Sequence, residues 1–500
     1  MKPPEFLMFT SARWYPRVPF ILSVLILTVS AVSAVWASVV RAESKHGGWT
    51  RFRGPNGTGV AETGDLPLRF GPAHNVVWKT ELALGHSSPV LTEDRIFLTA
   101  TRDGKLLTLA LSRNDGKILW EREAPRDRVE PVDKRNNAAS PSAVTDGEAV
   151  YVFFPDYGLL SYDIEGQERW RVPLGPFDNL YGMGASPILA DDKVVLVCDQ
   201  NTGSFLIGID KQDGRVRWKT LRPESKSGHS TPVVYRPGDG STQIVVPGSF
   251  YLMAYSSDTG EKIWWVRGLS FELKSTPAVL GDTAYINSYG YPDNQPGQQI
   301  PVPTVEEVFA ARDVNQDARL SAEELPDDRT RARMVVMDLD ENDLVDAEEW
   351  KYYREAMVSE NGLLAIRLGG RGDMTATNIR WRFHKSIPQL PSPLAYKDVL
   401  YMVDDGGVVT SLDPVTGAMK KRGRLTGALG PYYASPVASD GKVFMVSEEG
   451  KVAVLKPDGS LELLALNDLE EPCYATPAIA DGRIYIRTTN SLYCFGSTDG

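Results

Sequence analysis

The sequence predicts an all-β fold: an eight-bladed β-propeller of four-stranded blades, closed by an N-terminal strand, with a small α-helical EF-hand insertion in blade 5. The first supporting observation is a Ser/Thr-Pro dipeptide that recurs eight times, at intervals of 41 to 52 residues apart from one of 116. Such a period is typical of stacked β units that cannot bury a core alone. The second is that the last repeat lacks its fourth strand, whereas one predicted strand without a blade precedes the first repeat. The dipeptides are Ser88-Pro89, Ser140-Pro141, Ser186-Pro187, Thr231-Pro232, Thr276-Pro277, Ser392-Pro393, Ser435-Pro436 and Thr476-Pro477.

The N-terminus predicts export. Basic residues precede an uncharged run of 23 residues from Val18 to Val40, and small-residue cleavage sites end at Ala37 and Ala42. A run of this length can also span a bilayer, so residues 1–42 are either a cleaved signal peptide or an uncleaved membrane anchor. In both cases the body of the protein is exported, to the periplasm or the extracellular space, and any membrane contact is made through this segment.

The segment 75–80 is predicted to close the ring. It has the pattern of a strand that ends a blade, including Trp78, but no blade precedes it. The eighth repeat has only three predicted strands before the chain ends at Gly500. Pairing the two removes two exposed sheet edges at once.

Each repeat predicts the same four strands. In the first, a short strand at 90–91 follows the dipeptide, strands at 95–99 and 106–111 come next, and the last strand ends in Trp120. Gly-containing turns between the strands supply the positive φ that tight hairpins need. Four antiparallel strands with an aromatic residue at a fixed place describe a propeller blade. The equivalent tryptophans are Trp170, Trp218, Trp264 and Trp381.

The interval of 116 residues exceeds its neighbours by about seventy, which predicts an insertion before the blade strand at 363–368. Within it, residues 305–312, 329–337 and 347–357 have helical patterns. The chain is therefore divided into a targeting segment (1–42), the closing strand and blades 1 to 5 in part (49–290), an EF-hand pair (291–361) and the rest of the propeller (362–500).

Two twelve-residue segments of the insertion match the EF-hand loop. Oxygen side chains at positions 1, 3, 5 and 9, a backbone carbonyl at position 7 and a Glu at position 12 give calcium its ligands. The alternative is a degenerate acidic hairpin without metal. The predicted ligands of two calcium sites are Asp313, Asn315, Asp317, Arg319, Ser321 and Glu324 in the first loop, and Asp338, Asp340, Asn342, Leu344, Asp346 and Glu349 in the second.

Both loops lack the glycine expected at position 6, where Ala318 and Asp343 stand instead. This position needs a left-handed backbone, which costs Ala about 1–2 kcal/mol and is better tolerated by Asp. The second loop also has more carboxylates. It is therefore expected to bind calcium more tightly than the first.

Charge and cysteine content exclude some functions. The net charge is −11, and −9 of it lies between Asp313 and Trp350. The remaining chain offers no basic stripe, so nucleic-acid binding is not expected. The chain has three cysteines, Cys198, Cys473 and Cys494, which are too few to stabilise a protein of this size through disulfides. Cys473 and Cys494 share the last repeat and could pair. Buried free thiols are the favoured interpretation.

The repeats resemble those of pyrroloquinoline-quinone (PQQ)-type propellers. Residues 412–417, and residues 255–260 followed by Trp264, look like the tryptophan-docking repeat of this superfamily, which includes quinoprotein alcohol dehydrogenases and the outer-membrane barrel-assembly propeller. The opening Trp49–Gly57 is similar to the lead-in of large exported bacterial members with no assigned reaction. The resemblance covers residues 49–500 apart from the insertion and implies the fold rather than a function.

The dehydrogenases of this superfamily hold their quinone over an adjacent Cys-Cys pair, beside a carboxylate/Asn set that binds its calcium. No adjacent cysteines occur here, and no such set can be placed on the blades. A PQQ cofactor is therefore not expected, and no catalytic residue is assigned.

A ligand site is predicted at the axis of the ring. The residue three positions before each repeat proline would lie at one mouth of the axial channel, because the innermost strands begin there. The predicted ligand-binding residues are His86, His229, Lys274, Tyr433 and Tyr474; the other three positions are Ala138, Gly184 and Leu390. If the two histidines titrate near pH 6.5, an anionic ligand should bind better on acidification. Ordinary rim residues in contact with water are the alternative.

Two functions from different classes remain. The leading hypothesis is an exported, non-catalytic binding or scaffold protein for a protein, peptide or glycan partner, with a calcium-loaded EF-hand pair. The other is a periplasmic oxidoreductase with a quinone-type cofactor in the axial funnel, which absorbance of the purified protein would reveal.

Overall fold

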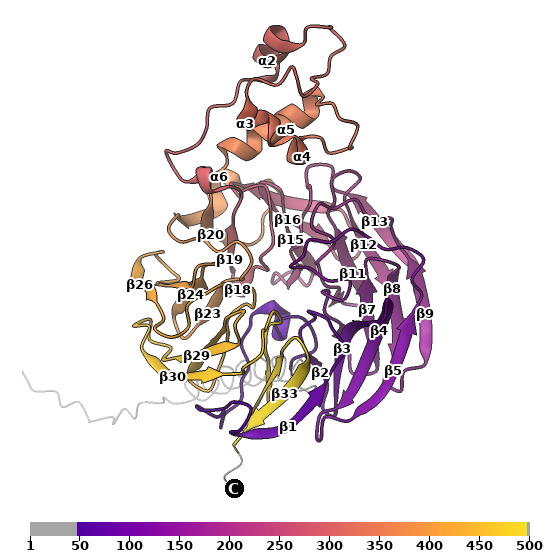
Figure 1. The fold of residues 1–500 in the computed structure, drawn as a ribbon, viewed down its shortest axis with the longest axis vertical. Helices are drawn as coiled ribbons and strands as arrows, with labels where there is room; N and C mark the ends of the chain where they lie inside the picture. Colours follow the sequence, from indigo (N-terminus) through magenta and orange to yellow (C-terminus); the bar gives the residue numbers. More distant parts are fainter. Residues whose placement is uncertain (1–47, 498–500) are drawn as a thin grey trace, which may run out of the picture. The chain divides into compact units, whose positions relative to one another are not determined.

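The structure is a computed structural model that describes residues 48–497. These residues form eight sheets around a central axis, which confirms the predicted eight-bladed propeller (Figure 1). The predicted targeting segment, residues 1–42, lies outside the described residues. None of the helices within 48–497 is long and apolar enough to cross a membrane.

Blades 1 to 4 follow one another in sequence, each with its strands in chain order. Blade 1 contains β2 (Val90–Leu91), β3 (Arg95–Arg102), β4 (Lys105–Ser112) and β5 (Ile118–Ala124). Blade 2 contains β6 (Val144–Thr145), β7 (Ala149–Phe154), β8 (Gly158–Asp163) and β9 (Glu168–Pro173). Blade 3 contains β10 (Ile188–Ala190), β11 (Lys193–Cys198), β12 (Phe205–Asp210) and β13 (Val216–Leu221). Blade 4 contains β14 (Val233–Tyr235), β15 (Gln243–Gly248), β16 (Tyr251–Ser256) and β17 (Lys262–Arg267).

Blades 5 to 8 complete the ring. Blade 5 contains β18 (Ala278–Leu280), β19 (Thr283–Ser288), β20 (Gly362–Arg367) and β22 (Ile379–Phe383). Blade 6 contains β23 (Leu394–Tyr396), β24 (Val399–Val403), β25 (Val408–Leu412) and β26 (Met419–Arg424). Blade 7 contains β27 (Val437–Ser439), β28 (Lys442–Val446), β29 (Lys451–Leu455) and β30 (Leu463–Asp468). Blade 8 contains β31 (Ala478–Ala480), β32 (Arg483–Arg487), β33 (Ser491–Gly496) and β1 (Val76–Glu81).

The two ends of the chain share blade 8. Strand β1 pairs antiparallel with β33, with Trp78 opposite Cys494 and Glu81 opposite Ser491. The N-terminal strand thus fills the place left empty by the last repeat, as the sequence predicts.

Tryptophans join neighbouring blades. The indole Nε1 of Trp78 donates to the carbonyl of Arg113 in blade 1, and that of Trp120 donates to Ile164 in blade 2. A Cβ on Gly116 would come within 2.5 Å of Trp78, so this turn needs glycine for the indole as well as for its φ of 74°. Trp170, Trp218 and Trp381 bond the next blade in the same way, which accounts for the recurring Trp and Gly.

Blade 4 departs from this pattern because the segment after β20 takes a different path. Strand β21 (Gly372–Asp373) leaves blade 5 and pairs parallel with β17, as a fifth strand of blade 4. Helix α6 (Thr375–Asn378) follows it. Trp264 is fully buried and donates to Gln243 of its own blade at 2.8 Å.

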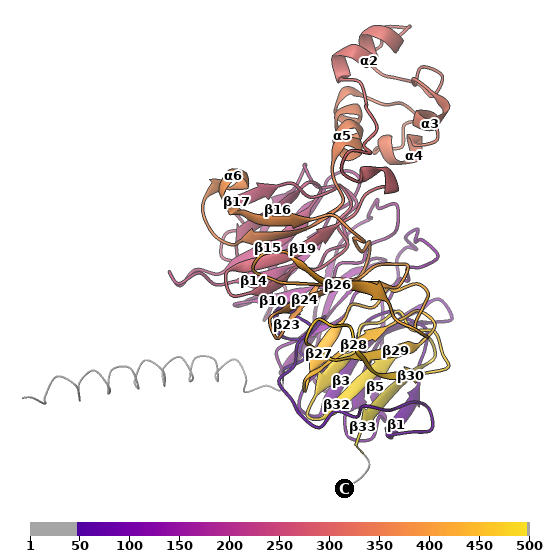
Figure 2. The same cartoon turned by 90° about the vertical axis from the view of Figure 1, so that its left-hand side faces the viewer.

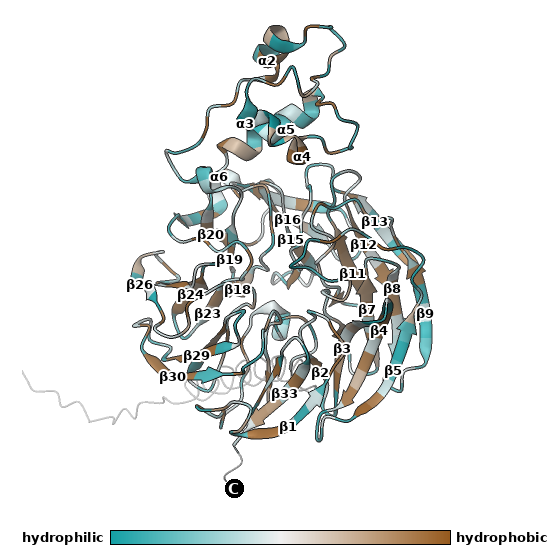
Figure 3. Ribbon diagram, viewed as in Figure 1, coloured by the Kyte–Doolittle hydropathy of each residue, from teal (hydrophilic) through white to brown (hydrophobic). Residues whose placement is uncertain are grey.

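The hydrophobic core lies between the blades, and the fraction of buried residues falls towards the outer strands. Every residue of β7 is buried, whereas Trp170 is the one buried residue of the outer strand β9. Figure 3 shows the same gradient, with brown along β7 and more teal along β9. Stacked blades bury apolar faces that a single blade leaves open.

The helical insertion lies between β19 and β20, two neighbouring strands in which Ser288 pairs with Gly362. Figure 2 shows its helices together beyond the blades. Its elements are η2 (Pro292–Asn294), α2 (Val305–Arg312), α3 (Asp328–Arg331), α4 (Met334–Met337) and α5 (Ala347–Val358).

The helix expected over 329–337 is divided into α3 and α4. At the break, the Arg333 N–H bonds the Thr330 carbonyl three residues back. The Arg333 guanidinium meanwhile lies over the Tyr291 ring and bonds Asp293. These long-range contacts of one side chain accompany the interruption, and the helical pattern of the sequence does not reveal them.

Candidate functional site

A ring of hydroxyl groups surrounds the axis. At seven of the eight blade junctions, the backbone N–H of one Ser or Thr donates to the hydroxyl of the equivalent residue in the next blade, at 2.9–3.0 Å. The last of these bonds, from Thr476 to Ser88, joins blade 8 to blade 1. The ring explains why a Ser or Thr recurs. Its members are Ser88, Ser142, Ser186, Thr231, Thr276, Ser392, Ser435 and Thr476.

The ring corrects the alignment of blade 2. Its member is Ser142, not Ser140 of the dipeptide, because Ser142 accepts from Ser88 and donates its own N–H to Ser186. The dipeptide is displaced by two residues in this blade. Ser140 therefore takes the place that the proline alignment gave to Ala138, and Ser140 lines the axial cavity whereas Ala138 does not.

The lead-in segment crosses one end of the axis. The carbonyls of Trp49 and Thr50 accept from Leu91 in blade 1 and Thr145 in blade 2. Further along, Asn56 bonds both backbone groups of Val234 in blade 4. The Gly59 carbonyl accepts from Ala438 in blade 7. This segment, residues 49–61, thus joins inner strands on opposite sides of the ring.

Two arginines of the crossing segment are buried beneath the hydroxyl ring. Arg51 donates to the carbonyl of Pro232 and Arg53 to that of Pro393, each next to a ring residue. Burial lowers the pKa of both guanidinium groups to about 9, which leaves them protonated at neutral pH. They fix the segment to blades 4 and 6.

The other end of the axis holds a cavity of about 220 Å³. Phe52 of the crossing segment lines it, so this segment closes one end of the channel. All five predicted ligand-binding residues also line it: His86, His229, Lys274, Tyr433 and Tyr474. They come from loops before five different inner strands and meet because the ring closes.

One wall of the cavity is aromatic. The His86 and Tyr474 rings stack with centroids 4.5 Å apart, and Tyr433 stacks on Tyr474 at 5.4 Å. The Tyr474 hydroxyl donates to Glu448 at 2.6 Å, which fixes the ring. The wall is therefore preformed.

The opposite wall carries charged groups that are already paired. Lys274 is buried against Glu272, and its ammonium lies 4.9 Å from the centre of the Tyr181 ring. Above the cavity, the long loop between β5 and β6 brings Arg135 into an ion pair with Asp133 at 2.7 Å. Arg135 lowers the pKa of Asp133.

Several cavity residues could not be predicted from the sequence because they lie in loops of unequal length that share no repeat position. They are Phe52, Asp133, Arg135, Asn136, Tyr181 and Gln389. Seven of the eight ring residues, all except Ser142, belong to the recurring dipeptide itself.

The two histidines do not fit the expected titration near pH 6.5. Burial, together with the charge of Arg487, lowers the pKa of His86 to about 4. Burial and then Lys274 lower the pKa of His229 to about 3. Both rings are neutral at physiological pH, so they give an anion no added attraction between pH 6 and 7.

The insertion forms two helix-flanked loops joined by a short β bridge. Leu320 and Val345 exchange backbone hydrogen bonds at 2.9 Å in both directions. Position 6 of each loop is left-handed, with φ of 62° at Ala318 and 64° at Asp343. The expected strain at Ala318 is therefore present in the backbone.

The second loop gathers its carboxylates. Ligand atoms of Asp338, Asp340 and Glu349 lie within 4.8 Å of one another, which is the only such acidic, His or Cys group among residues 48–497. The backbone N–H groups of Asn342 and Asp343 donate to Asp338 and shape the loop. These donors fit the oxygen preference of a calcium ion.

Among residues 48–497, the carboxylates of the first loop do not form such a cluster. Asn315 donates to Asp317 at 2.9 Å, and Glu324 accepts from Val314 and Ser321. The side chains predicted for this site thus bond one another or the loop backbone.

The residues present do not fit a quinone dehydrogenase site. Cys198, Cys473 and Cys494 are buried, free thiols, so the pairing considered for the last two is not formed. None of the three lines the axial cavity, and Asp133, the one carboxylate that does, is paired with Arg135.

Comparisons with known proteins support the fold. The profile of the family described as outer membrane protein assembly factor BamB matches residues 73–200 and 203–295. No curated protein matches the chain. Among solved structures, BamB from Moraxella catarrhalis is 13% identical with a TM-score of 0.51, covering 84% of this chain and 98% of its own.

Two dehydrogenases of known structure resemble this chain to about the same extent as BamB does. Quinohemoprotein alcohol dehydrogenase from Comamonas testosteroni is 10% identical with a TM-score of 0.53, covering 92% of this chain and 82% of its own. A europium-containing methanol dehydrogenase is 9% identical with a TM-score of 0.54, covering 92% of this chain and all of its own. At these identities the likeness concerns the fold, which an outer-membrane assembly factor and dehydrogenases share.

Proposed function

We propose that this chain is an exported, calcium-binding propeller of the PQQ-like type that acts as a non-catalytic binding or scaffold protein. The observation that carries the proposal is the axial cavity, whose charged side chains are paired with one another. A general base works best with a pKa near the operating pH. The lowered pKa values of His86 and His229, about 4 and 3, make both poor bases at neutral pH.

The cavity suits an uncharged polar group. Its hydroxyl ring offers donors and acceptors, and its aromatic wall offers apolar contact. An isolated charge would have to compete with the existing Lys274–Glu272 and Arg135–Asp133 pairs. The end of a glycan or a polar loop of a partner protein has this chemistry.

Calcium is proposed for both loops of the insertion. The oxygens of Asp338, Asp340, Asn342, Asp346 and Glu349 and the Leu344 carbonyl would hold it in the second loop. Those of Asp313, Asn315, Asp317, Ser321 and Glu324 and the Arg319 carbonyl would hold it in the first. The ion would supply a charge that fixes the loops and contribute to stability by mass action.

An oxidoreductase that uses a quinone is the competing function. The cavity lacks the residues that the superfamily resemblance implies for that cofactor. Purified protein should have no absorbance beyond that of its aromatic residues; a bound quinone chromophore would reject the proposal.

The binding function is tested with glycan and peptide arrays probed with the labelled full chain. Replacing Tyr433 and Tyr474 by Ala should abolish any signal of the wild-type protein. Tyr235→Ala, at a partly exposed residue of β14 outside the cavity, should retain it. Equal binding by all three proteins would place the partner elsewhere on the surface and overturn the proposal.

Export to the periplasm or beyond rests on the N-terminal sequence pattern. The matched family has a name that refers to outer-membrane protein assembly, which agrees with this location. Fractionation of cells that express the full chain, with and without residues 1–42, tests it.

A further inference from the structure

Helix α5 of the insertion contacts the propeller next to the second calcium loop. Glu349, at position 12 of that loop, lies in the first turn of α5, and Tyr352 lies in the next turn. The Tyr352 hydroxyl is 3.3 Å from Ser249 Oγ, and its ring packs edge-on against Phe250 at 5.5 Å. Both partners follow β15 in blade 4. One short helix thus joins a calcium ligand to the propeller.

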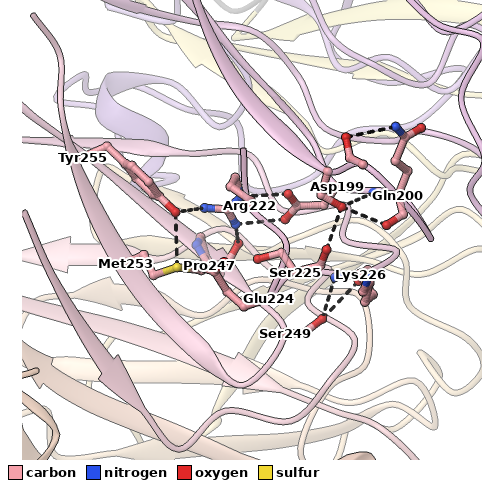
Figure 4. A network of polar contacts seen from close by, with 12 residues as sticks. Asp199, Gln200, Arg222, Glu224, Ser225, Lys226, Pro247, Ser249, Met253 and Tyr255 are labelled. Atoms are coloured by element: carbon pink, nitrogen blue, oxygen red, sulfur yellow. Dashed lines mark hydrogen bonds and ion pairs between the residues drawn. The ribbon is translucent and has the colours of Figure 1, made fainter. Parts of the chain in front are cut away.

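Ser249 in turn holds the loop that enters the cavity. Its Oγ accepts from the Lys226 N–H at 2.9 Å and donates to the Lys226 carbonyl at 3.2 Å (Figure 4). Three residues later, His229 lines the cavity, and its N–H is fixed to the Leu273 carbonyl. The segment 226–229 therefore connects Ser249 to the cavity wall.

The start of this loop is rigidly held. Arg222 is fully buried and donates to both carboxylate oxygens of Asp199, at 2.8 and 2.9 Å, and to the Tyr255 hydroxyl (Figure 4). Ser204 bonds the Ser225 carbonyl at 2.6 Å. Residues 222–225 are therefore anchored, and segment 226–229 lies between this anchor and the cavity wall.

A second contact reaches the same wall from the other side. Tyr291, at the beginning of the insertion, packs on Phe271 with ring centroids 5.1 Å apart and lies near the charge of Glu272. Glu272 pairs with Lys274 and lies within hydrogen-bonding range of Tyr181. Phe250 and Phe271 both belong to the apolar cluster of the insertion.

Charge also favours contact between the second loop and segment 226–229. Lys226 lies within electrostatic range of Asp346 and Glu349. Seven carboxylates lie between Asp338 and Glu349, so the loop stays negative with a divalent cation bound. Calcium therefore does not reverse the attraction of Lys226 to the loop.

We infer that calcium bound in the second loop orders the half of the axial cavity formed by residues 226–229 and 272–274, so that ligand affinity in the cavity depends on calcium. The inference rests on the proposed calcium and binding functions. An ion that ties Glu349 to Asp338 and Asp340 restrains the first turn of α5, and Tyr352 transmits the restraint to Ser249. Ligand binding to an already ordered wall loses less conformational entropy.

The test uses calcium alone and hydrogen–deuterium exchange of the full chain. Calcium should slow exchange severalfold in peptides covering 226–232 and 270–276, and leave blade 7 peptides unchanged. Glu349→Gln should abolish the effect. Tyr352→Phe should still bind calcium but lose the slowing in 226–232.

Matched controls separate the contact from the helix. Tyr353→Phe removes the neighbouring hydroxyl of α5, which faces Arg333 inside the insertion, and should retain the full effect. Calorimetry of the same samples separates the two proposals. No heat with wild-type protein rejects calcium binding itself. Calcium binding with unchanged exchange in 226–232 and 270–276 overturns this inference, and an unaltered effect in Tyr352→Phe overturns the assigned contact.

Discussion

His86 and His229 lie in the cavity wall, where burial disfavours their charged form. Their lowered pKa values, about 4 and 3, compare with about 6.5 in an unfolded chain. Below pH 6.5 the unfolded state therefore binds more protons than the native state. The stability contributed by the neutral rings consequently decreases as the pH decreases.

The pH dependence of stability that is due to the two histidines can be measured by comparing the wild-type protein with a variant that lacks both. Between pH 6.5 and 4, the free energy of unfolding should fall by up to ~1.4 kcal/mol per pH unit for each histidine, in addition to the effect of carboxylates. Replacing both by Gln should remove this part of the slope. Chemical unfolding across the pH range, with wild type and double variant compared, checks it; parallel curves would mean that the histidines are accessible to protons.

The two serines of blade 2 give a second residue-scale prediction. Ser142→Ala leaves the buried Ser88 N–H without its acceptor and should destabilise the protein by about 1–3 kcal/mol. Ser140→Ala affects the N–H of Asn137, which water can reach, and should cost less than ~1 kcal/mol. Urea unfolding of the two variants decides whether Ser142 or Ser140 is the ring residue. A larger loss of stability in Ser140→Ala than in Ser142→Ala would favour Ser140, the residue of the dipeptide.

At the scale of elements, the two loops proposed to bind calcium differ in backbone strain. Ala318 adopts a φ of 62°, which only glycine adopts without cost. Ala318→Gly should therefore strengthen calcium binding to the first loop by about 1 kcal/mol. Asp343→Gly, at the equivalent position of the second loop, should gain less; isothermal titration of both variants measures the difference.

The position-12 glutamates provide the complementary experiment. Glu349→Gln should weaken calcium binding more than Glu324→Gln, because Glu349 already lies with Asp338 and Asp340. Equal losses in calorimetric titrations would contradict the ranking of the two loops.

Some elements could be predicted from the sequence and others could not. Tight turns, the tryptophan strands and the closing strand were predicted because each depends on local residue types repeated in every blade. The position of Ser142 was missed because the Ser140-Pro141 dipeptide happens to lie two residues earlier. The division into α3 and α4, the path of β21 and the loop that carries Arg135 depend on contacts between distant segments, which no local pattern reveals.

At the scale of the molecule, the insertion and the N-terminal segment should differ in their importance for the ring. Ser288 and Gly362 are paired neighbours, so joining them by a short glycine turn in place of 291–361 should preserve the propeller and abolish calcium binding. Removing residues 49–82 takes away both β1 and the crossing segment, and should lower the melting temperature of the whole domain. Calorimetric scans of the two deletions test this; equal stabilities would contradict the closure of the ring by β1.

The crossing segment and the residues that follow it, as far as Phe70, also have a consequence for the order of folding. These N-terminal residues are synthesised first, yet they bond partners near the opposite end of the chain. Thr63 bonds Ser439 across 376 positions, and Phe70 bonds Asn467 across 397. Such distant contacts make closure slow, and blades 1 to 6 must wait with open edges for the last two. A chain built in this way completes its fold only after nearly all of it is available, so the export proposed above would leave ring closure to the far side of the membrane.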